Sequence, residues 1–445
     1  MAQESTERSQ ANVAAWIARH PFVLGAVSSG ISIGATMAVM AARFPDFAGW
    51  PGSRGFVGIA ANLAQDGIFA SAGESSTTER MPLYPLLLAA VMRIVGADWR
   101  WWAVGLNALA LVACGGLATQ LCARFRAGAA ATWACALVLA FHIAWSIEAL
   151  AFRETVWFAL ALLGIATLLT TPQIGAVRLG LAGALAGAAY LLRPTGFLIV
   201  AVLPFWLWIV RRFLTHRWAR ATAIALSVAA LPVIGWQVYT VHTVGHLQLS
   251  NGEGGNTALK GAIPEFWVVA PWVDLDLLDT RIVAEAARAG NDSPETRDRF
   301  WRKRAEAEVR AAPGDWLVKA GLKTAMMISP VSVPFGYGQL VPQGSSLRLV
   351  GFRWDPWAFA SVPAVLLILG GMGWRWWRWP PTEKLERAFM LAVALLVAAI
   401  FVLHAATSGE TRYRLPFDPL LAILAAPMIG RWWTVVTSRR RPATP

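Results

Sequence analysis

The sequence predicts an all-α integral membrane protein, a multi-pass helical bundle of about 10–12 transmembrane helices whose external loops bear short amphipathic helices. Composition is the first reason. Of the 445 residues, 56% are hydrophobic and 15% are charged, whereas soluble domains carry about 25% charged residues. The second reason is that apolar runs of about 20 residues, the length that crosses a bilayer, recur along the chain. An ordinary soluble enzyme, a disordered protein and a disulfide scaffold are thereby excluded.

The apolar runs define the expected spans. One run, 179–210, is too long for a single helix, and Arg193-Pro194 interrupts it, so we expect two helices that meet at this pair. The segment 82–97 is short and carries Arg93, which indicates a short span or a re-entrant helix. The remaining runs each fit one span and lie at 22–42, 101–123, 128–147, 149–171, 221–241, 356–374, 388–406 and 416–436.

Arginine placement predicts the orientation, because short cytoplasmic loops are rich in Lys and Arg. With the basic groups inside, the N-terminal tail 1–21 and the basic tail 437–445 are cytoplasmic, and ten crossings result if 82–97 is re-entrant. Bundle helices then occupy 22–241 and 356–436, with external segments at 43–81, 142–154, 242–355 and 407–415. The basic groups are Arg124/Arg126, Arg211/Arg212/Arg217/Arg220, Arg375/Arg378 and Arg439/Arg440/Arg441.

The formal net charge of +13 has an explanation within the membrane. Segment 251–316 has a net charge of −3, which leaves +16 on the rest of the chain. Because much of that excess faces the proposed cytoplasmic side, it fits the positive-inside pattern and anionic membrane lipids. We therefore expect no nucleic-acid partner.

The large external segment has predicted elements of its own. Residues 295–312 form an amphipathic pattern, and Lys319 and Lys323 indicate that 316–334 lies at the membrane interface. Elsewhere, the three cysteines lie in apolar runs without CxxC spacing, and the histidines show no metal-ligand spacing, so we predict neither a redox nor a zinc site.

Charged residues at the edges of apolar segments are the candidates for chemistry, because each is costly there. A carboxylate can act as a general base on a hydroxyl, and Arg offers a planar fork to phosphate oxygens. On the predicted topology all the candidates lie near the external face. They are Asp46, Arg80, Glu148, Glu154, Arg193, Glu410, Arg412 and Arg414.

Six segments, in order along the chain, resemble the GT-C type glycosyltransferases, the multi-pass enzymes that include the protein mannosyltransferase and aminoarabinose-transferase superfamily. The resemblance covers roughly residues 23–429. It is carried by Phe56–Phe69, Thr78–Pro85 with its PLYP sequence, Glu154–Phe158, Gly183–Thr195 ending in RPT, Asn251–Asn256, and Arg412–Pro416 with the sequence RYRLP.

The resemblance implies an enzyme of the bacterial inner membrane that takes a sugar from a polyprenyl-phosphate donor. The acceptor would be a hydroxyl of a glycan, lipid or protein on the periplasmic side, and the mechanism would be inverting. A divalent metal is a further candidate cofactor. The alternatives are a lipid-linked sugar flippase or transporter, an envelope polysaccharide polymerase or ligase, and a catalytically silent scaffold.

The resemblance also suggests roles for residues. A first-loop acid is typical of the group, about four residues before the Phe56 position, but Gly52 stands there. Asp46 is therefore the first candidate for the catalytic carboxylate, with Glu154 second and Glu79 as a further alternative. Substrate-binding roles are expected for Arg80, Tyr84, Glu148, Arg193, Arg412, Tyr413 and Arg414.

Overall fold

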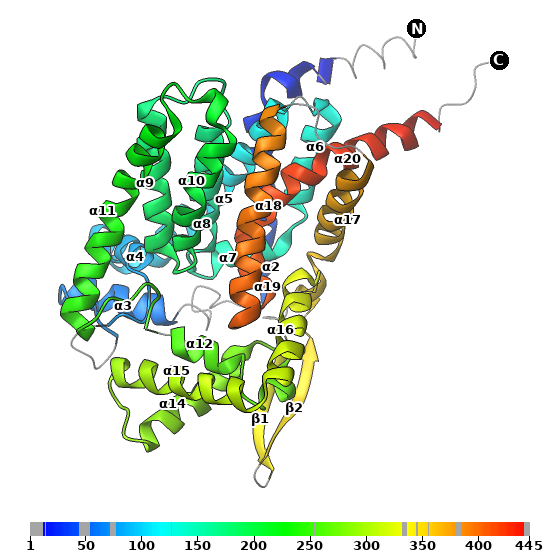
Figure 1. Cartoon of the computed structure of the whole chain (residues 1–445). Coiled ribbons are helices and arrows are strands. Elements are labelled where there is room, and N and C mark those ends of the chain that lie inside the picture. The colour runs from blue at the N-terminus through cyan, green and yellow to red at the C-terminus, as the bar shows by residue number, and fades with distance from the viewer. Residues whose placement is uncertain are drawn as a thin grey trace.

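A computed structural model describes residues 12–13, 15–43, 54–71, 77–125, 127–252, 254–331, 336–343, 346–354, 356–378 and 384–439. Asp46 and Gly52 lie outside these residues. The described chain forms a bundle of long helices, and a smaller unit extends from one end of it (Figure 1). We call this smaller part, residues 245–361, the extramembrane unit.

The helices confirm the predicted all-α multi-pass fold class. Five helical segments of the described chain are long and apolar enough to span a membrane, a sixth arises from a pair bent by 51°, and four shorter apolar helices complete the bundle. The bundle helices are α2 (Pro21–Arg43), α4 (Leu83–Val95), α5 (Trp99–Arg124), α6 (Gly128–Ala140), α7 (Ile143–Leu150), α8 (Thr155–Leu169), α9 (Ala176–Leu192), α10 (Gly196–Ile209), α11 (Trp218–Val244), α17 (Val362–Arg378), α18 (Lys384–Ala406) and α20 (Asp418–Arg439).

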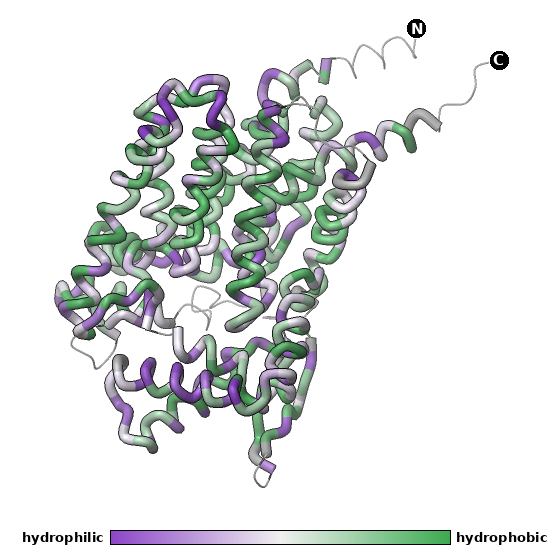
Figure 2. Tube along the Cα trace, in the orientation of Figure 1, coloured by the Kyte–Doolittle hydropathy of each residue, from purple (hydrophilic) through white to green (hydrophobic). Residues whose placement is uncertain are grey.

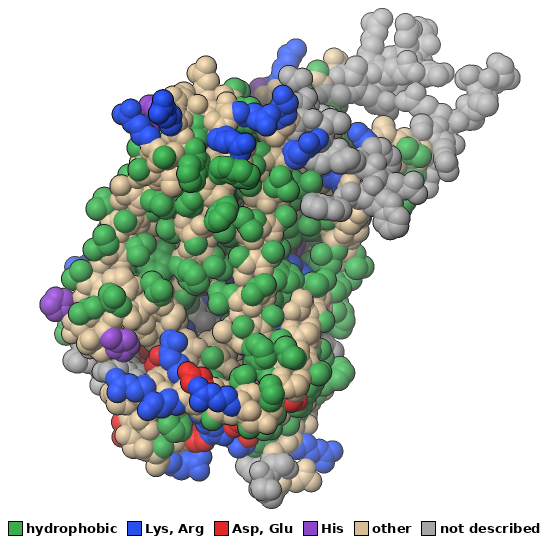
Figure 3. Space-filling view, in the orientation of Figure 1, with side chains coloured by type: hydrophobic (Ala, Val, Ile, Leu, Met, Phe, Trp, Pro, Cys, Tyr) green, Lys and Arg blue, Asp and Glu red, His purple; other side chains and the backbone are tan. Residues whose placement is uncertain are grey.

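The two ends of the bundle differ in the connections between helices that they carry. The connections α8–α9, α10–α11 and α17–α18 lie at one end, where Lys and Arg side chains gather at the top of Figure 3. We call this the basic end. The opposite end, the junction end, carries the α7–α8 and α9–α10 turns and the extramembrane unit. This alternation agrees with the predicted grouping of the basic loops.

Two predicted details can be compared with the structure. The long apolar run is broken where Arg193-Pro194 predicts, because α9 ends at Leu192 and α10 begins at Gly196. The segment 82–97 makes no crossing of its own. Its helix α4 packs on α3 (Arg54–Gln65) at the junction end and is followed directly by α5.

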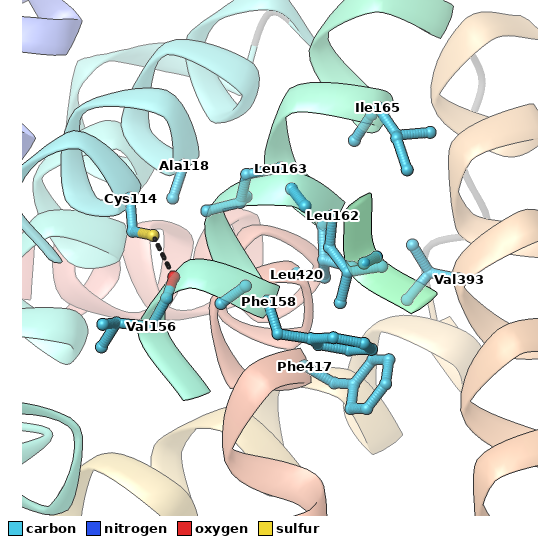
Figure 4. Close-up of a cluster of buried hydrophobic side chains, with 14 of the residues drawn as sticks. Cys114, Ala118, Val156, Phe158, Leu162, Leu163, Ile165, Val393, Phe417 and Leu420 are labelled. Carbon is cyan, nitrogen blue, oxygen red and sulfur yellow. Dashed lines mark hydrogen bonds between the residues drawn. The ribbon is translucent and has the colours of Figure 1, made fainter. Parts of the chain in front are cut away.

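Apolar packing accounts for the bundle. Helix α8 lies at its centre, where Leu162 and Phe158 pack on Phe417 and Leu420 of the last helices (Figure 4). In the same core the Cys114 thiol donates to the Val156 carbonyl oxygen, 3.6 Å away. Many exposed side chains of the bundle helices are also apolar, and hydrophobic residues predominate between the two ends of the bundle in Figure 2. A lipid-facing surface is expected to look like this.

The extramembrane unit has a separate small core built on Phe266, Leu275, Leu278 and Trp301. A bulged antiparallel hairpin, which the sequence did not predict, lies at its edge. Its elements are α12 (Gly254–Lys260), α13 (Phe266–Val269), α14 (Asp279–Arg288), α15 (Pro294–Ala311), α16 (Pro313–Ile328), β1 (Gly336–Gln343) and β2 (Ser346–Trp354).

Two predictions concern this unit. The expected amphipathic helix at 295–312 is confirmed as α15. The expectation that 316–334 lies at the membrane interface stays a prediction. Its Lys319 and Lys323 side chains are fully buried rather than exposed. Each instead bonds backbone carbonyl oxygens, as a buried ammonium group must.

Candidate functional site

The candidate site lies at the junction end, where the α9–α10 turn, the turn before α8 and the segment between α18 and α20 meet the extramembrane unit. It contains a short helix, α19 (Thr411–Arg414). We call the four residues Glu154, Arg193, Arg412 and Tyr413 the junction cluster.

Glu154 and Arg193 form its first contact. Arg193 has extended backbone between two helices, since Pro194 prevents α9 from continuing. Glu154 precedes α8, where an acid also suits the helix dipole. The Arg193 Nε atom lies 2.9 Å from Glu154 Oε1, and their side chains are only 12% and 9% exposed. Each charge at this depth depends on its partner.

Tyr413 is the centre of the cluster. Its ring stacks on His404 of α18 with a centroid distance of 3.8 Å. The guanidinium carbons of Arg193 and Arg412 lie 5.7 and 5.2 Å from the same ring. The hydroxyl is 3.1 Å from the Ser408 hydroxyl. One aromatic ring therefore holds two arginines from distant segments near each other.

Arg412 connects the bundle to the extramembrane unit. Its Nη1 and Nη2 atoms donate to both oxygens of Asp276 at 2.7 and 3.0 Å, which is the bidentate geometry of an Arg–carboxylate pair. Asp274 and Glu410 are also in ion-pair contact, at 3.4 and 3.0 Å. Lys260 binds Asp276 from the other side at 2.6 Å. A chain of alternating charges results.

The protonation states of the acids in this ion-pair network follow from their surroundings. Burial opposes ionisation of Asp276, but Arg412 and Lys260 hold the pKa of this carboxyl well below its usual range. Burial raises the pKa of Glu410 to about 8, against the opposing effect of Arg412. At neutral pH the site therefore has an ionised Asp276 and a largely protonated Glu410.

A second acid–base pair lies nearby. Arg153 Nη1 is 2.9 Å from Glu148 Oε1, and the Thr155 hydroxyl donates to Glu148 Oε2 at 2.8 Å. Burial opposes the charge of Arg153, but Glu148 raises its pKa above the usual value. The structure thus pairs Arg193 with Glu154, and Arg153 with Glu148.

Three other residues expected to bind substrate also have partners within the protein. Arg414 is 3% exposed, pairs with Asp418 at 2.9 Å and donates to the carbonyl oxygens of Met327 and Ser329. Tyr84 is completely buried, and its hydroxyl accepts a bond from Asn107. The Arg80 guanidinium carbon lies 5.4 Å from the centre of the Phe56 ring. We therefore assign Arg414 and Tyr84 to positioning of the helices.

A close contact fixes the extramembrane unit against the cluster. A side chain at Gly261 would place its Cβ 1.7 Å from the Thr407 carbonyl oxygen, so only glycine fits there. Lys323 Nζ donates to the carbonyl oxygens of Thr407 and Gly261 at 2.8 and 3.3 Å. Burial, together with the positive charge of Lys319, lowers the pKa of Lys323 to about 7. The turn that leads to Arg412 is thereby held in place.

A bound metal ion would need several ligand side chains close together. Among the residues that the structure describes, no group of three or more His, Cys, Asp and Glu side chains is arranged to hold a metal ion. Asp46 is not described, so its participation in a metal site or as a base stays a prediction.

Sequence reasoning missed the partners that the fold supplies. Asp274, Asp276 and Lys260 lie far along the chain from Arg412, in a segment notable only for its many acids. His404 had no spacing signal, and its stacking on Tyr413 depends on how α18 meets α19.

Comparisons with known proteins were made for the whole chain. No protein-family model and no curated protein matches the sequence. Among solved structures, the chain is similar to the oligosaccharyltransferase of Archaeoglobus fulgidus in its apo form. The identity is 13%, the TM-score is 0.48, and the match covers 95% of this chain and 51% of that one.

Two further solved structures are similar. ArnT from Cupriavidus metallidurans, bound to undecaprenyl phosphate, matches at 14% identity and a TM-score of 0.34, over 89% of this chain and 77% of that one. The archaeal oligosaccharyltransferase AglB, in complex with an inhibitory peptide and a dolichol-phosphate, matches at 12% identity and a TM-score of 0.40, over 88% and 48%. The chain thus spans about half the length of the oligosaccharyltransferases. These proteins are GT-C glycosyltransferases, the class that the sequence motifs resemble. TM-scores below 0.5 mark a distant likeness, so the chemistry below is inferred from the side chains of the site.

Proposed function

We propose that the protein is an integral-membrane glycosyltransferase that moves a sugar from a polyprenyl-phosphate donor to an acceptor hydroxyl at the junction end. One observation carries this proposal. Two arginines, Arg193 and Arg412, lie against the same Tyr413 ring, and a buried carboxylate, Glu154, is bound to one of them. Paired arginines suit a phosphate, and the carboxylate suits a hydroxyl acceptor.

The donor phosphate would replace carboxylates that now hold the arginines. Asp276 presents two oxygens to the two Nη atoms of Arg412, which is also how a phosphate binds a guanidinium group. Arg193 is similarly engaged by Glu154. Phosphate binding would therefore exchange partners within the cluster, and the released Asp276 would keep its ion pair with Lys260.

This exchange also provides the base. When the donor phosphate takes over Arg193, the Glu154 carboxylate loses this partner and can meet the acceptor hydroxyl. Glu154 would then accept the proton of the acceptor hydroxyl as its oxygen attacks the anomeric carbon. The bond from that carbon to the phosphate oxygen breaks, its electron pair leaves with polyprenyl phosphate, and the configuration inverts. Arg193 and Arg412 stabilise the charge on the leaving phosphate. Asp46 remains an alternative base, as the motif resemblance suggests.

An apolar cleft supplies a place for the polyprenyl chain. A cavity of about 380 Å³ lies between α17, α18 and α20 and is lined along α18 from Met390 to Phe401. This stretch is about 16 Å long. Phe401 is one helical turn from His404, which stacks on Tyr413. The cleft thus runs through the apolar band toward the cluster.

The location proposed is a bacterial inner membrane with the site on the periplasmic side. Its support is the charge asymmetry, because the basic end lies opposite the junction cluster and basic loops stay in the cytoplasm.

Donor binding tests the phosphate part of the proposal. Polyprenyl phosphate is titrated into the purified full-length chain in nanodiscs, and its affinity is compared among wild type, Arg193→Gln and Arg412→Gln. We expect each variant to bind at least about tenfold more weakly, since a charge-assisted bond contributes about 1.5–3 kcal/mol. Arg211→Gln at the basic end is the matched control and should bind normally. Equal affinity in all four proteins contradicts the proposal.

A further inference from the structure

A second polar cavity lies in the extramembrane unit, apart from the junction cluster. It has a volume of about 100 Å³ and lies between the segment 77–82, α12, α14 and α15. Glu79, Gly252, Asn256, Asp279, Val283, Arg297 and Trp301 line it. Nothing in the proposed transfer step uses these residues.

The walls of this cavity are built by close backbone contacts between two loops. The Gly252 amide donates to the Thr78 carbonyl oxygen at 2.7 Å, and Asn251 Nδ2 donates to the Glu79 carbonyl oxygen at 2.8 Å. A Cβ at Gly252 would lie 2.8 Å from Thr78 Oγ1, so a side chain there would push the loops apart. Asn251 and Gly252 therefore hold one side of the cavity closed.

Asn256 is the most informative wall residue. It is 5% exposed, and its Nδ2 donates to Asp279 Oδ1 at 2.9 Å. The other polar atom of the same side chain, the Oδ1 of Asn256, takes no part in this bond. That oxygen is buried and accepts no hydrogen bond from the described part of the chain. A buried acceptor without a partner is costly, so a donor from a ligand or water is expected at this point.

The other walls suit a hydroxyl-rich ring. The Glu79 and Asp279 carboxylates can accept from hydroxyl groups. Trp301 is 4% exposed and its indole N–H donates to the Ile282 carbonyl oxygen at 3.3 Å, so the ring is fixed as an apolar wall. Each carboxylate already faces a cation, since Arg297 Nη2 lies 3.6 Å from Glu79 Oε1 and Lys260 Nζ lies 2.9 Å from Asp279 Oδ1, so the cavity has no excess positive charge to bind an anion.

Charge pairs connect this cavity to the junction cluster. Asp279 lies 2.9 Å from Lys260, Lys260 lies 2.6 Å from Asp276, and Asp276 binds Arg412. A ligand held in the cavity therefore lies on the same face of the extramembrane unit that approaches the proposed donor site.

We infer that this cavity is a subsite for a neutral sugar ring of the acceptor, one that lies remote from the reacting hydroxyl. The identification of this sugar as part of the acceptor rests on the proposed function, whereas sugar binding by the cavity does not. A volume of 100 Å³ takes the edge of one pyranose ring and no larger unit. Remote binding of this kind positions the acceptor and contributes to its KM.

Saturation-transfer NMR with methyl α-D-glucopyranoside and methyl α-D-mannopyranoside tests the subsite in the full-length protein without any donor. We expect binding of at least one glycoside, about fivefold weaker in Asn256→Leu, which removes the free acceptor oxygen. Val283→Phe should weaken binding similarly by filling the cavity, with all polar walls intact. Glu306→Gln, on exposed α15 surface, is the matched control. Thermal unfolding verifies that each variant is folded.

The outcomes separate the two proposals. Glycoside binding without sugar transfer from any polyprenyl-phosphate donor would leave the subsite standing and refute the transferase. In an active enzyme we expect Asn256→Leu to raise the acceptor KM about fivefold and leave the donor KM unchanged. No binding of either glycoside, equal binding by wild type and both variants, or binding of glucose 6-phosphate alone would overturn the subsite.

Discussion

Asp276 occupies the face of Arg412 that a phosphate would use, so its removal should improve donor binding. The perturbation is Asp276→Asn, which keeps the shape and removes the charge. Arg412 loses its bidentate partner, with donor–acceptor distances of 2.7 and 3.0 Å, and Lys260 loses one of its two acids. The positive charge available to a phosphate therefore rises.

The magnitude follows from distance and exposure. Two unit charges about 4 Å apart attract by about 4 kcal/mol at an effective dielectric constant of 20. The Asp276 side chain is 42% exposed, and Arg412 keeps the Asp274 carboxylate, so the effective gain falls to about 1 kcal/mol. This corresponds to about fivefold tighter binding of polyprenyl phosphate.

The assay is a titration of polyprenyl phosphate into nanodisc-embedded protein at pH 7.5 and fixed salt. Asp274→Asn is the matched control, because its single 3.4 Å contact predicts a smaller gain. Unchanged or weaker binding by Asp276→Asn would refute the idea that the carboxylate holds the place of a phosphate.

Three further predictions concern the site and its support. For Lys323 the folded pKa is about 7 and the unfolded pKa about 10.5, so the unfolded state binds more protons between these values and stability rises with pH there. The melting temperature of wild type should therefore rise relative to Lys323→Met between pH 7 and 10, and a constant difference would contradict the shift. Gly261→Ala should destabilise by about 1–3 kcal/mol through its clash with the Thr407 carbonyl group, as measured by thermal unfolding. Gly321→Ala, with open space around it, should be neutral or stabilising, and equal losses in the two would count against the close contact. Tyr413→Leu should weaken polyprenyl phosphate binding several-fold through the loss of two cation–π contacts, whereas Tyr413→Phe should bind nearly normally; similar losses in both would point to the hydroxyl.

The bundle was predictable because its signals are local. Uninterrupted apolar runs define helices in a bilayer without reference to any partner, and Arg193-Pro194 marks its own break. The hairpin at 336–354 has no such signal. The burial of Lys319 and Lys323 was not predictable, because a lysine in an apolar helix indicates an exposed ammonium group unless the fold supplies carbonyl oxygens, as the segment 261–263 and Thr407 do here.

The candidate site was predictable only in part. Cost arguments about charges near a membrane singled out Glu154, Arg193 and Arg412, and the fold brings these three residues to one end. They could not distinguish Arg412 from Arg414, two residues away, because the difference lies in what each meets. Arg414 meets the α16 end and Asp418, whereas Arg412 meets the acids of the extramembrane unit, whose position depends on packing over more than 100 residues.

Sugar transfer itself tests the central claim most directly. The full-length protein is reconstituted with a polyprenyl-phosphate-linked sugar and a candidate acceptor, and both free polyprenyl phosphate and glycosylated acceptor are measured by mass spectrometry. We predict transfer by wild type and a loss of about 10²–10⁴-fold in Glu154→Gln with donor binding retained, as removal of a general base requires. Glu306→Gln should transfer at the wild-type rate. A donor that crosses the membrane uncleaved would indicate a flippase, and full activity in Glu154→Gln would show that another carboxylate is the base.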